Sequence, residues 1–265
     1  MLRSLKEMEG FDVRGEDGEV GKVSDFYFDA PEWIIRYAIV HTGDWLTGRL
    51  VLISPDSFKK PEWQEKTFPV SLTRKEIENN PTIDEELPVS RQKERSMIEY
   101  YSWPFYWGAA TQRPVTAPGG PAAAPMRQIP VYEDQLREDQ KEEGRDRDEG
   151  NDPHLRSLNE VEGYDIKATD GEIGHVENLI VDTDNWAIRY IVVDTRDWIP
   201  GSKKVLIAPE WINWIGYANQ NIAVDLDKDT IENAPSYDPD APIDRKYETK
   251  LYDYYKRPKY WEIDQ

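Results

Sequence analysis

The chain has 265 residues, of which 52 are acidic and 33 basic, and its formal net charge is −19 at neutral pH. Such a charge repels polyphosphates and anionic lipids, so direct nucleic-acid binding is disfavoured. The absence of cysteine excludes disulfides and thiolate chemistry. The sequence shows neither the apolar run of a signal peptide nor about 18 consecutive apolar residues that could span a bilayer. We therefore expect a cytoplasmic protein without a transmembrane segment.

An internal repeat runs through most of the sequence. The stretch from Asp17 to Val23 (Asp-Gly-Glu-Val-Gly-Lys-Val) returns from Asp170 to Val176 as Asp-Gly-Glu-Ile-Gly-His-Val. The correspondence continues from 2–107 to 155–261, with one residue inserted near Ser202. A match of this length indicates duplication of a whole domain rather than a short solenoid unit.

The repeated stretch predicts a β-hairpin in each copy, because glycine accepts the positive φ that tight turns require. We interpret six residues as structural turn residues: Asp17, Gly18, Gly21, Asp170, Gly171 and Gly174. Alternation and β-branched content predict strands at 11–14, 19–28, 33–40, 50–53 and 67–70, and at 164–167, 172–181, 186–193, 204–207 and 221–226. Trp33 and Trp186 should be core residues at strand starts.

One short helix is predicted in each copy. The first begins with the capping box of Thr73 and Glu76 and ends at Pro81, while the second begins at Asp227 and ends at Pro235. Each copy then ends in an aromatic extension (94–107 and 248–261) with the pattern Tyr-Tyr-x-x-Pro-x-Tyr-Trp. We expect these extensions to fold back over the domain or to dock on a partner.

The segment between the copies is rich in proline, alanine and glycine and then in acidic residues. Nothing in it could offset the entropy of ordering, so we predict a disordered linker. The predicted organisation is a first domain at 1–107, a linker at 108–153 and a second domain at 154–265.

Several features together resemble the PRC-barrel domain, which is shared by the cytoplasmic part of the photosynthetic reaction-centre H subunit and by the ribosome maturation factor RimM. In the first copy they are Gly10, Val13, the turn 17–23, Asp25, Asp29, 33–37, 51–55 and 68–70. The resemblance covers both copies and is closest to stand-alone tandem PRC-barrel proteins of bacteria. It implies a mainly β fold, with two small barrels that serve as interaction platforms and carry no catalytic residues.

No residue pattern indicates catalysis or a bound metal or cofactor. The histidines at 41, 154 and 175 do not recur between the copies, so we interpret them as surface residues. Asp225, Asp227 and Asp229 alternate as the first ligands of a calcium loop do, but Thr230 and Ser236 stand where that loop needs glycine and glutamate. We therefore expect a protein that is not an enzyme and that needs no cofactor.

The aromatic extensions and two loops supply the candidate partner-binding residues, because tyrosine and tryptophan combine a large apolar area with a polar tip. The candidates are Tyr101, Trp107, Tyr255 and Trp261 in the extensions and Trp45 and Trp198 in the loops. The favoured function is a protein-interaction scaffold with an unknown protein partner, built as an internal pseudo-dimer or able to form homo-oligomers. The alternatives are a ribosome-assembly or RNA-associated factor, which the charge opposes, and a soluble accessory of a photosynthetic or electron-transport complex.

Overall fold

The computed structural model describes residues 1–46, 48–79, 91–104, 106, 155–195, 203–217 and 219–262, with only the backbone described at 91–93. The predicted linker, His154 and Pro81 lie outside these residues. The domain boundaries at 107 and 154 also fall there, so they stay a prediction.

The first copy contains six strands and three α-helices among the described residues. They are β1 (Leu2–Ser4), α1 (Leu5–Met8), β2 (Asp12–Gly15), β3 (Gly18–Asp29), β4 (Ile34–His41), β5 (Leu50–Ile53), β6 (Thr67–Pro69), α2 (Arg74–Glu78) and α3 (Arg91–Tyr101), with short 3-10 helices η1 (Gly43–Leu46) and η2 (Pro55–Ser57).

The second copy repeats this order and adds one strand. Its elements are β7 (Leu155–Ser157), α5 (Leu158–Val161), β8 (Asp165–Ala168), β9 (Gly171–Asp182), β10 (Ala187–Asp194), β11 (Lys204–Ile207), η3 (Pro209–Trp211), β12 (Ile212–Gly216), β13 (Asn221–Val224), α6 (Lys228–Glu232) and α7 (Arg245–Tyr255). The protein is mainly β, as the sequence predicts, and all predicted strands are present within two residues of their expected ends.

The prediction of one helix per copy is incomplete. The capping-box helix is present as α2, where the Thr73 hydroxyl accepts from the amide of Glu76 and the Glu76 carboxylate accepts from the amide of Thr73. The aromatic extensions, however, contain the longest described helices, α3 and α7, and a one-turn helix follows each of the two short strands β1 and β7. The helical residues of the extensions face the domain with their apolar side.

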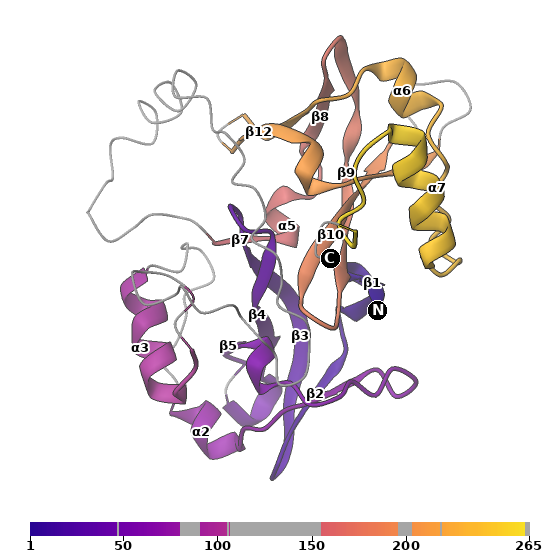
Figure 1. The fold of residues 1–265 in the computed structure, drawn as a ribbon. Helices are drawn as coiled ribbons and strands as arrows, with labels where there is room; N and C mark the ends of the chain where they lie inside the picture. Colours follow the sequence, from indigo (N-terminus) through magenta and orange to yellow (C-terminus); the bar gives the residue numbers. More distant parts are fainter. Residues whose placement is uncertain are drawn as a thin grey trace.

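Both copies belong to one continuous sheet (Figure 1). The strand order is β12-β13-β8-β9-β10-β4-β3-β2-β6, so the first copy meets the second where β4 lies beside β10. Two main-chain hydrogen bonds join the copies at this point, from Ile35 to the carbonyl of Trp186 (2.8 Å) and from Ile188 to the carbonyl of Trp33 (2.7 Å). Their symmetry indicates an approximate twofold axis between the two copies.

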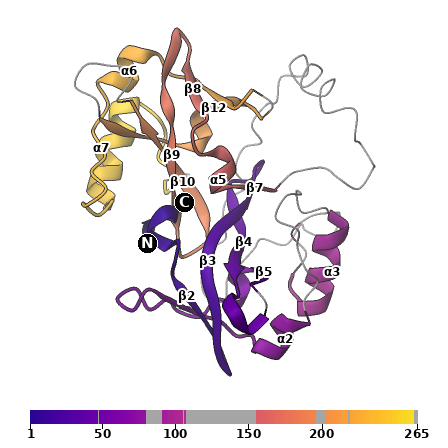
Figure 2. The same cartoon turned by 180° about the vertical axis from the view of Figure 1, so that it is seen from behind.

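The copies also exchange their N-terminal strands. Strand β1 of the first copy pairs antiparallel with β9 of the second, with Leu2 opposite Asp182 and Ser4 opposite Ile180. Strand β7 of the second copy pairs in the same way with β3 of the first, with Leu155 opposite Asp29. Figure 2 shows the long strand β3 with β7 at its end, seen from behind. We call β1 with α1, and β7 with α5, the exchanged arms.

A polar residue of each long strand binds the start of the exchanged helix from the other copy. Asn178 on β9 accepts from the amide of Lys6 (3.3 Å) and donates to the hydroxyl of Ser4 (2.6 Å). At the equivalent position on β3, Asp25 accepts from the amide of Asn159 in α5 (3.4 Å). Both contacts satisfy amide groups at a helix N-terminus that would otherwise lack partners.

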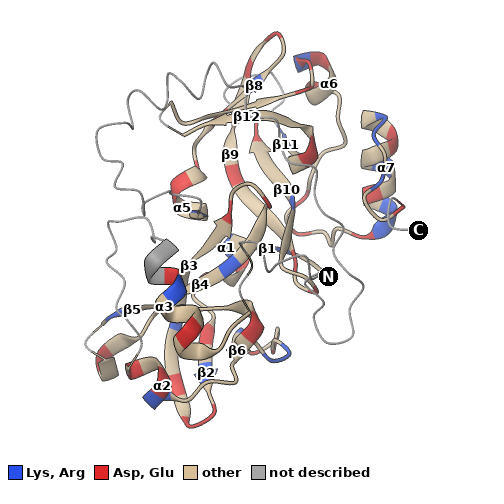
Figure 3. Cartoon of the chain, turned by 60° about the vertical axis from the view of Figure 1, so that its left-hand side comes forward, with Lys and Arg blue, Asp and Glu red and all other residues tan. Residues whose placement is uncertain are grey.

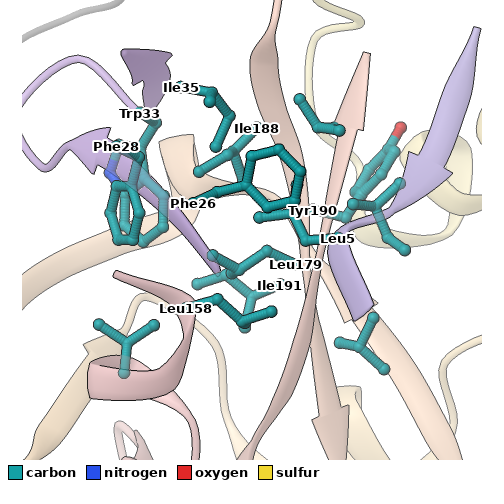
Figure 4. Close-up of a cluster of buried hydrophobic side chains, with 14 of the residues drawn as sticks. Leu5, Phe26, Phe28, Trp33, Ile35, Leu158, Leu179, Ile188, Tyr190 and Ile191 are labelled. Carbon is teal, nitrogen blue, oxygen red and sulfur yellow. The ribbon is translucent and has the colours of Figure 1, made fainter. Parts of the chain in front are cut away.

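The apolar core crosses the boundary between the copies. Leu5 and Met8 of α1 are fully buried, as is Leu158 of α5. Figure 4 shows Leu5 beside Tyr190 and Leu179 of the second copy, although Leu5 belongs to the first. A buried leucine of this kind contributes about 1.5–3 kcal/mol relative to an exposed one. The two copies therefore share one hydrophobic core.

Candidate functional site

A small cavity of about 90 Å³ lies where the two copies meet. Strand β4 and η2 form one side of it, the residues after α3 form another, and the turn before β10 of the second copy completes it. Among its lining residues are Arg36, Tyr37, Asp56, Trp103, Tyr106 and Trp186. No single copy contains all of these residues, so the cavity depends on the pairing of the copies.

A buried glutamate in α3 fixes two of the cavity's aromatic rings. Glu94 is fully buried and accepts hydrogen bonds from the hydroxyls of Tyr37 (3.1 Å) and Tyr106. The ring of Tyr106 in turn lies 3.9 Å from the guanidinium carbon of Arg36, which is a cation–π contact. Burial raises the pKa of the Tyr106 hydroxyl further above its ordinary value, so the hydroxyl stays protonated and donates to Glu94.

The second copy repeats the arrangement. Glu248 in α7 accepts from the hydroxyls of Tyr190 (2.7 Å) and Tyr260 (2.9 Å), and the ring of Tyr260 lies 4.2 Å from the guanidinium carbon of Arg189. An ion pair with Arg245 (3.1 Å) adds to this network. In each copy, therefore, a carboxylate in the aromatic extension holds that extension against the sheet.

Tryptophans from both copies close the cavity. The indole nitrogen of Trp103 donates to the hydroxyl of Ser57 (2.9 Å), and its ring stacks on Tyr101 with centroids 4.4 Å apart. Trp186 belongs to the second copy, but its ring contacts Phe26, Phe58 and Phe68 of the first copy, with ring centroids 5.2–6.4 Å apart. It is half-buried and has a positive φ of 58°, as its counterpart Trp33 does at 54°. Each tryptophan thus lies in the turn one residue before its strand, and Trp33 is a core residue as predicted (1% exposed), whereas Trp186 is only half-buried.

The candidate partner-binding residues differ in their exposure. Tyr255 is only 5% exposed and packs on Trp211. Trp261 and Tyr101 are half-buried, and Trp261 lies 4.1 Å from the guanidinium of Arg245. Trp45 donates to the carbonyl of Val20 (2.6 Å) and carries the guanidinium of Arg74 over its ring at 4.2 Å. Trp107 and Trp198 lie outside the described residues. The extensions thus fold back over the domain, while a binding role for these rings stays a prediction.

The repeated turn residues connect the hairpin to other elements. The carboxylate of Asp17 accepts from the amide of Arg74 in α2 (2.7 Å), and that of Asp170 accepts from the amide of Lys228 in α6 (2.9 Å). Gly18 and Gly171 have φ values of 150° and 141°. These contacts explain why the acidic residue precedes glycine in both copies, because it also binds the start of the following helix.

The second glycine of the repeated stretch allows a close approach between neighbouring strands. A Cβ atom at Gly21 would overlap the carbonyl oxygen of His41, and one at Gly174 would overlap that of Asp194. The preceding residues, Val20 and Ile173, sit at register shifts in the β2–β3 and β8–β9 pairs. The repeat therefore encodes a turn followed by a bulge.

The described histidines and the alternating aspartates, which were considered as metal ligands, do not come together in the structure. His41 is exposed and its Nδ1 accepts from the amide of Gly43 (3.2 Å), while His175 is half-buried on β9. Asp227 caps α6 by accepting from the amide of Thr230 (2.7 Å). Within the described ranges, no group of three or more histidine, aspartate or glutamate side chains is placed to hold a metal ion.

Sequence reasoning missed the residues that build the cavity. Arg36 and Tyr37 appeared only as part of a predicted strand and of the resemblance to the PRC-barrel domain, and Glu94 and Glu248 appeared only as the start of an extension. The repeat itself carried a usable signal, since Glu94, Tyr37, Tyr106 and Arg36 recur as Glu248, Tyr190, Tyr260 and Arg189. A charged residue that recurs inside an aromatic segment indicates a buried hydrogen-bonded carboxylate.

The comparison with protein families gives a clear result. The model of the PRC-barrel domain matches the chain twice, at residues 2–66 and 153–231. No curated protein matches the chain. In the part of the chain that the structure describes, no helix is long and apolar enough to cross a membrane.

Proposed function

Because this chain belongs to the PRC-barrel domain family and carries two copies of the domain, we propose that it works as a non-enzymatic, bivalent protein-interaction module. Two similar helical faces would each receive a partner surface. The shared sheet and the exchanged arms would hold these faces in a fixed relative orientation. Preorganisation of this kind lowers the entropic cost of binding at both faces.

The observation that carries the proposal is a repeated tyrosine on the outer helix pair of each copy. Tyr100 on α3 is 43% exposed and donates to the carbonyl of Glu76 in α2 (3.1 Å). Tyr254 on α7 donates to the carbonyl of Thr230 in α6 (2.8 Å) and is half-buried. Each ring is thus held in place while part of it faces solvent, which is typical of residues that anchor an interface.

The placement of charge and helices supports two separate contacts. Helices α3 and α7 lie on opposite sides of the molecule (Figure 1). Acidic residues occur on the helices and hairpin tips of both copies, and basic residues lie on the same helices (Figure 3). Helices α3 and α7 themselves each contain three basic and two acidic residues, so a contact at either face would depend on the tyrosine rings more than on charge.

A pull-down from native lysate tests the proposal. The parent chain is compared with Tyr100→Arg/Tyr254→Arg, which removes both rings at positions that reach solvent. The control Tyr100→Phe/Tyr254→Phe keeps the rings and removes only the hydroxyls. We expect a protein captured by the parent and the control and lost by the arginine variant. Equal capture by all three proteins would refute the assignment of these faces. A separate result would refute the non-enzymatic function: turnover of a substrate by the purified protein that a single substitution abolishes while the fold stays intact.

A further inference from the structure

Arg36 in the cavity between the copies has unused hydrogen-bonding capacity. Its side chain is only 10% exposed, and its Nε lies 3.8 Å from the carboxylate of Asp29, which is beyond hydrogen-bond distance. Its other close contact is the ring of Tyr106. A guanidinium offers five N–H donors. Among the described residues, none of these donors forms a hydrogen bond, although the group lines a cavity.

A carboxylate that forms no ion pair with any described residue lines the same cavity. Asp56 lies in η2, where its amide donates to the hydroxyl of Ser54 (3.3 Å). Its carboxylate forms neither a hydrogen bond nor an ion pair within the described part of the chain. Although Asp56 is exposed to solvent on one side, partial desolvation by the cavity wall raises the pKa of its carboxyl, and the charge of Arg36 lowers it. The two opposite charges thus influence each other without forming a direct pair.

The size of the cavity limits what could bridge them. A volume of about 90 Å³ corresponds to roughly three water molecules in the liquid. Typical substrate and cofactor sites have roughly 300–1,000 Å³, so a ligand here has only a handful of non-hydrogen atoms. The walls are largely apolar, with Trp103, Trp186 and Ile34 among them. Apolar walls lower the local dielectric and so strengthen interactions with Arg36, whose side chain is largely buried, more than with the exposed Asp56.

We propose that this cavity binds a small zwitterionic α-amino acid of the size of glycine or alanine. Its carboxylate would accept hydrogen bonds from the terminal nitrogens of Arg36, and its ammonium group would donate to Asp56. Planar guanidinium and carboxylate groups form paired hydrogen bonds well. Because Trp186 comes from the second copy, such a ligand would also favour the paired arrangement of the copies. This site is separate from the helical faces proposed for partner binding.

Isothermal titration calorimetry on the full chain tests the ligand class. Glycine and alanine should each give saturable binding. Glycinamide lacks the carboxylate and N-acetylglycine lacks the ammonium group, so each should bind at least tenfold more weakly than glycine. No binding of glycine, or equal binding of glycine and glycinamide, would overturn the proposal.

Variants then test the residues. Asp56→Asn changes an exposed side chain and should weaken glycine binding at least tenfold with an unchanged melting temperature. Arg36→Lys keeps the charge but loses the paired geometry, and a similar loss is expected. Glu210→Gln, at the equivalent position of the second copy and outside this cavity, should leave the affinity of the site unchanged. Full binding by Asp56→Asn, or equal weakening by Glu210→Gln, would contradict the assignment even if Arg36→Lys fails to fold.

Discussion

Asp25, which is buried, and Asn178, which is half-buried, occupy equivalent positions and bind the exchanged arms, but only Asp25 carries a charge. Asp25 is 5% exposed, and burial raises the pKa of its carboxyl above 3.8, against the lowering effect of hydrogen bonds from Phe26, Ser157 and Asn159. The folded state therefore binds this proton more tightly than the unfolded chain does. The ionised carboxylate costs stability as the pH rises through the range just above 3.8.

Replacing Asp25 by asparagine, the residue found at the equivalent position 178, should raise the free energy of unfolding. In Asp25→Asn, the amide can donate to Ser157 and accept from Asn159, as Asn178 does with Ser4 and Lys6. We expect a higher urea midpoint than that of the parent at pH 7, with the difference narrowing as the pH falls toward 4. The reverse substitution, Asn178→Asp, should lower the midpoint at pH 7. A destabilised Asp25→Asn at neutral pH would show that the charge itself is required.

The close strand approach at the repeated stretch gives a second test. Gly21→Ala would place a methyl group on the carbonyl of His41, so the backbone must shift. We expect a loss of about 1–3 kcal/mol in the free energy of unfolding, as for other strained backbone positions. The control is Gly10→Ala, where φ is also positive but no atom lies within 4 Å of the added methyl. The urea midpoint should fall further in Gly21→Ala than in the control, and an equal fall would argue against steric overlap.

At the scale of single residues, the sequence predicted the turn but not its long-range contacts. Asp17 and Gly18 form a local pattern that turn chemistry explains. The bond from Asp17 to Arg74 joins residues far apart in the chain, and no local pattern reports such a contact. The contacts of Trp186 with the first copy could not be predicted from the sequence either. Hydrophobic periodicity indicates that a ring is buried, but it does not indicate which residues bury it.

At the scale of elements, the exchanged arms are short but deeply buried. Leu5 and Leu158 are fully buried at equivalent positions in α1 and α5. Leu5→Ala should cost about 2–5 kcal/mol in the free energy of unfolding, and Leu158→Ala a similar amount. Hydrogen exchange should show that Leu5→Ala weakens protection in β9 of the second copy, against which α1 lies. Leu2→Ala, at a half-buried position of the same arm, is the control with a smaller loss. Loss of protection confined to the first copy would contradict the exchange.

The elements that the sequence missed have different physical causes. Strands of three residues, such as β1 and β7, are too short to show alternation. In α3 and α7, the buried positions 94, 97 and 98, their counterparts 248, 251 and 252, and the further buried position 255 follow helical spacing. Glutamate occupies the first position of each set, and a charged residue at a buried position interrupts the apolar pattern by which a helix is predicted from sequence. The long strands were predicted well because β-branched and aromatic residues dominate them.

At the scale of the molecule, neither copy is complete alone. Each would lose a strand paired with its longest strand, β3 or β9, and would expose the surface that an arm covers. An unpaired strand edge beside exposed apolar residues is a site of association. Composition and repetition predicted two domains, but they could not show whether the domains contact each other, since a repeat aligns equally well in separate and in joined copies.

Cleavage between the copies tests this dependence. A protease recognition sequence inserted after Gly120 allows the chain to be cut without changing any described residue. We expect the two fragments to co-elute at the size of the parent during size-exclusion chromatography at micromolar concentration, because each supplies a strand and a helix to the other. Cutting makes the association bimolecular, so strong dilution should separate the fragments. Leu5→Ala combined with Leu158→Ala should make them separate at higher concentration. Fragments that elute as separate folded monomers at micromolar concentration would refute a shared core.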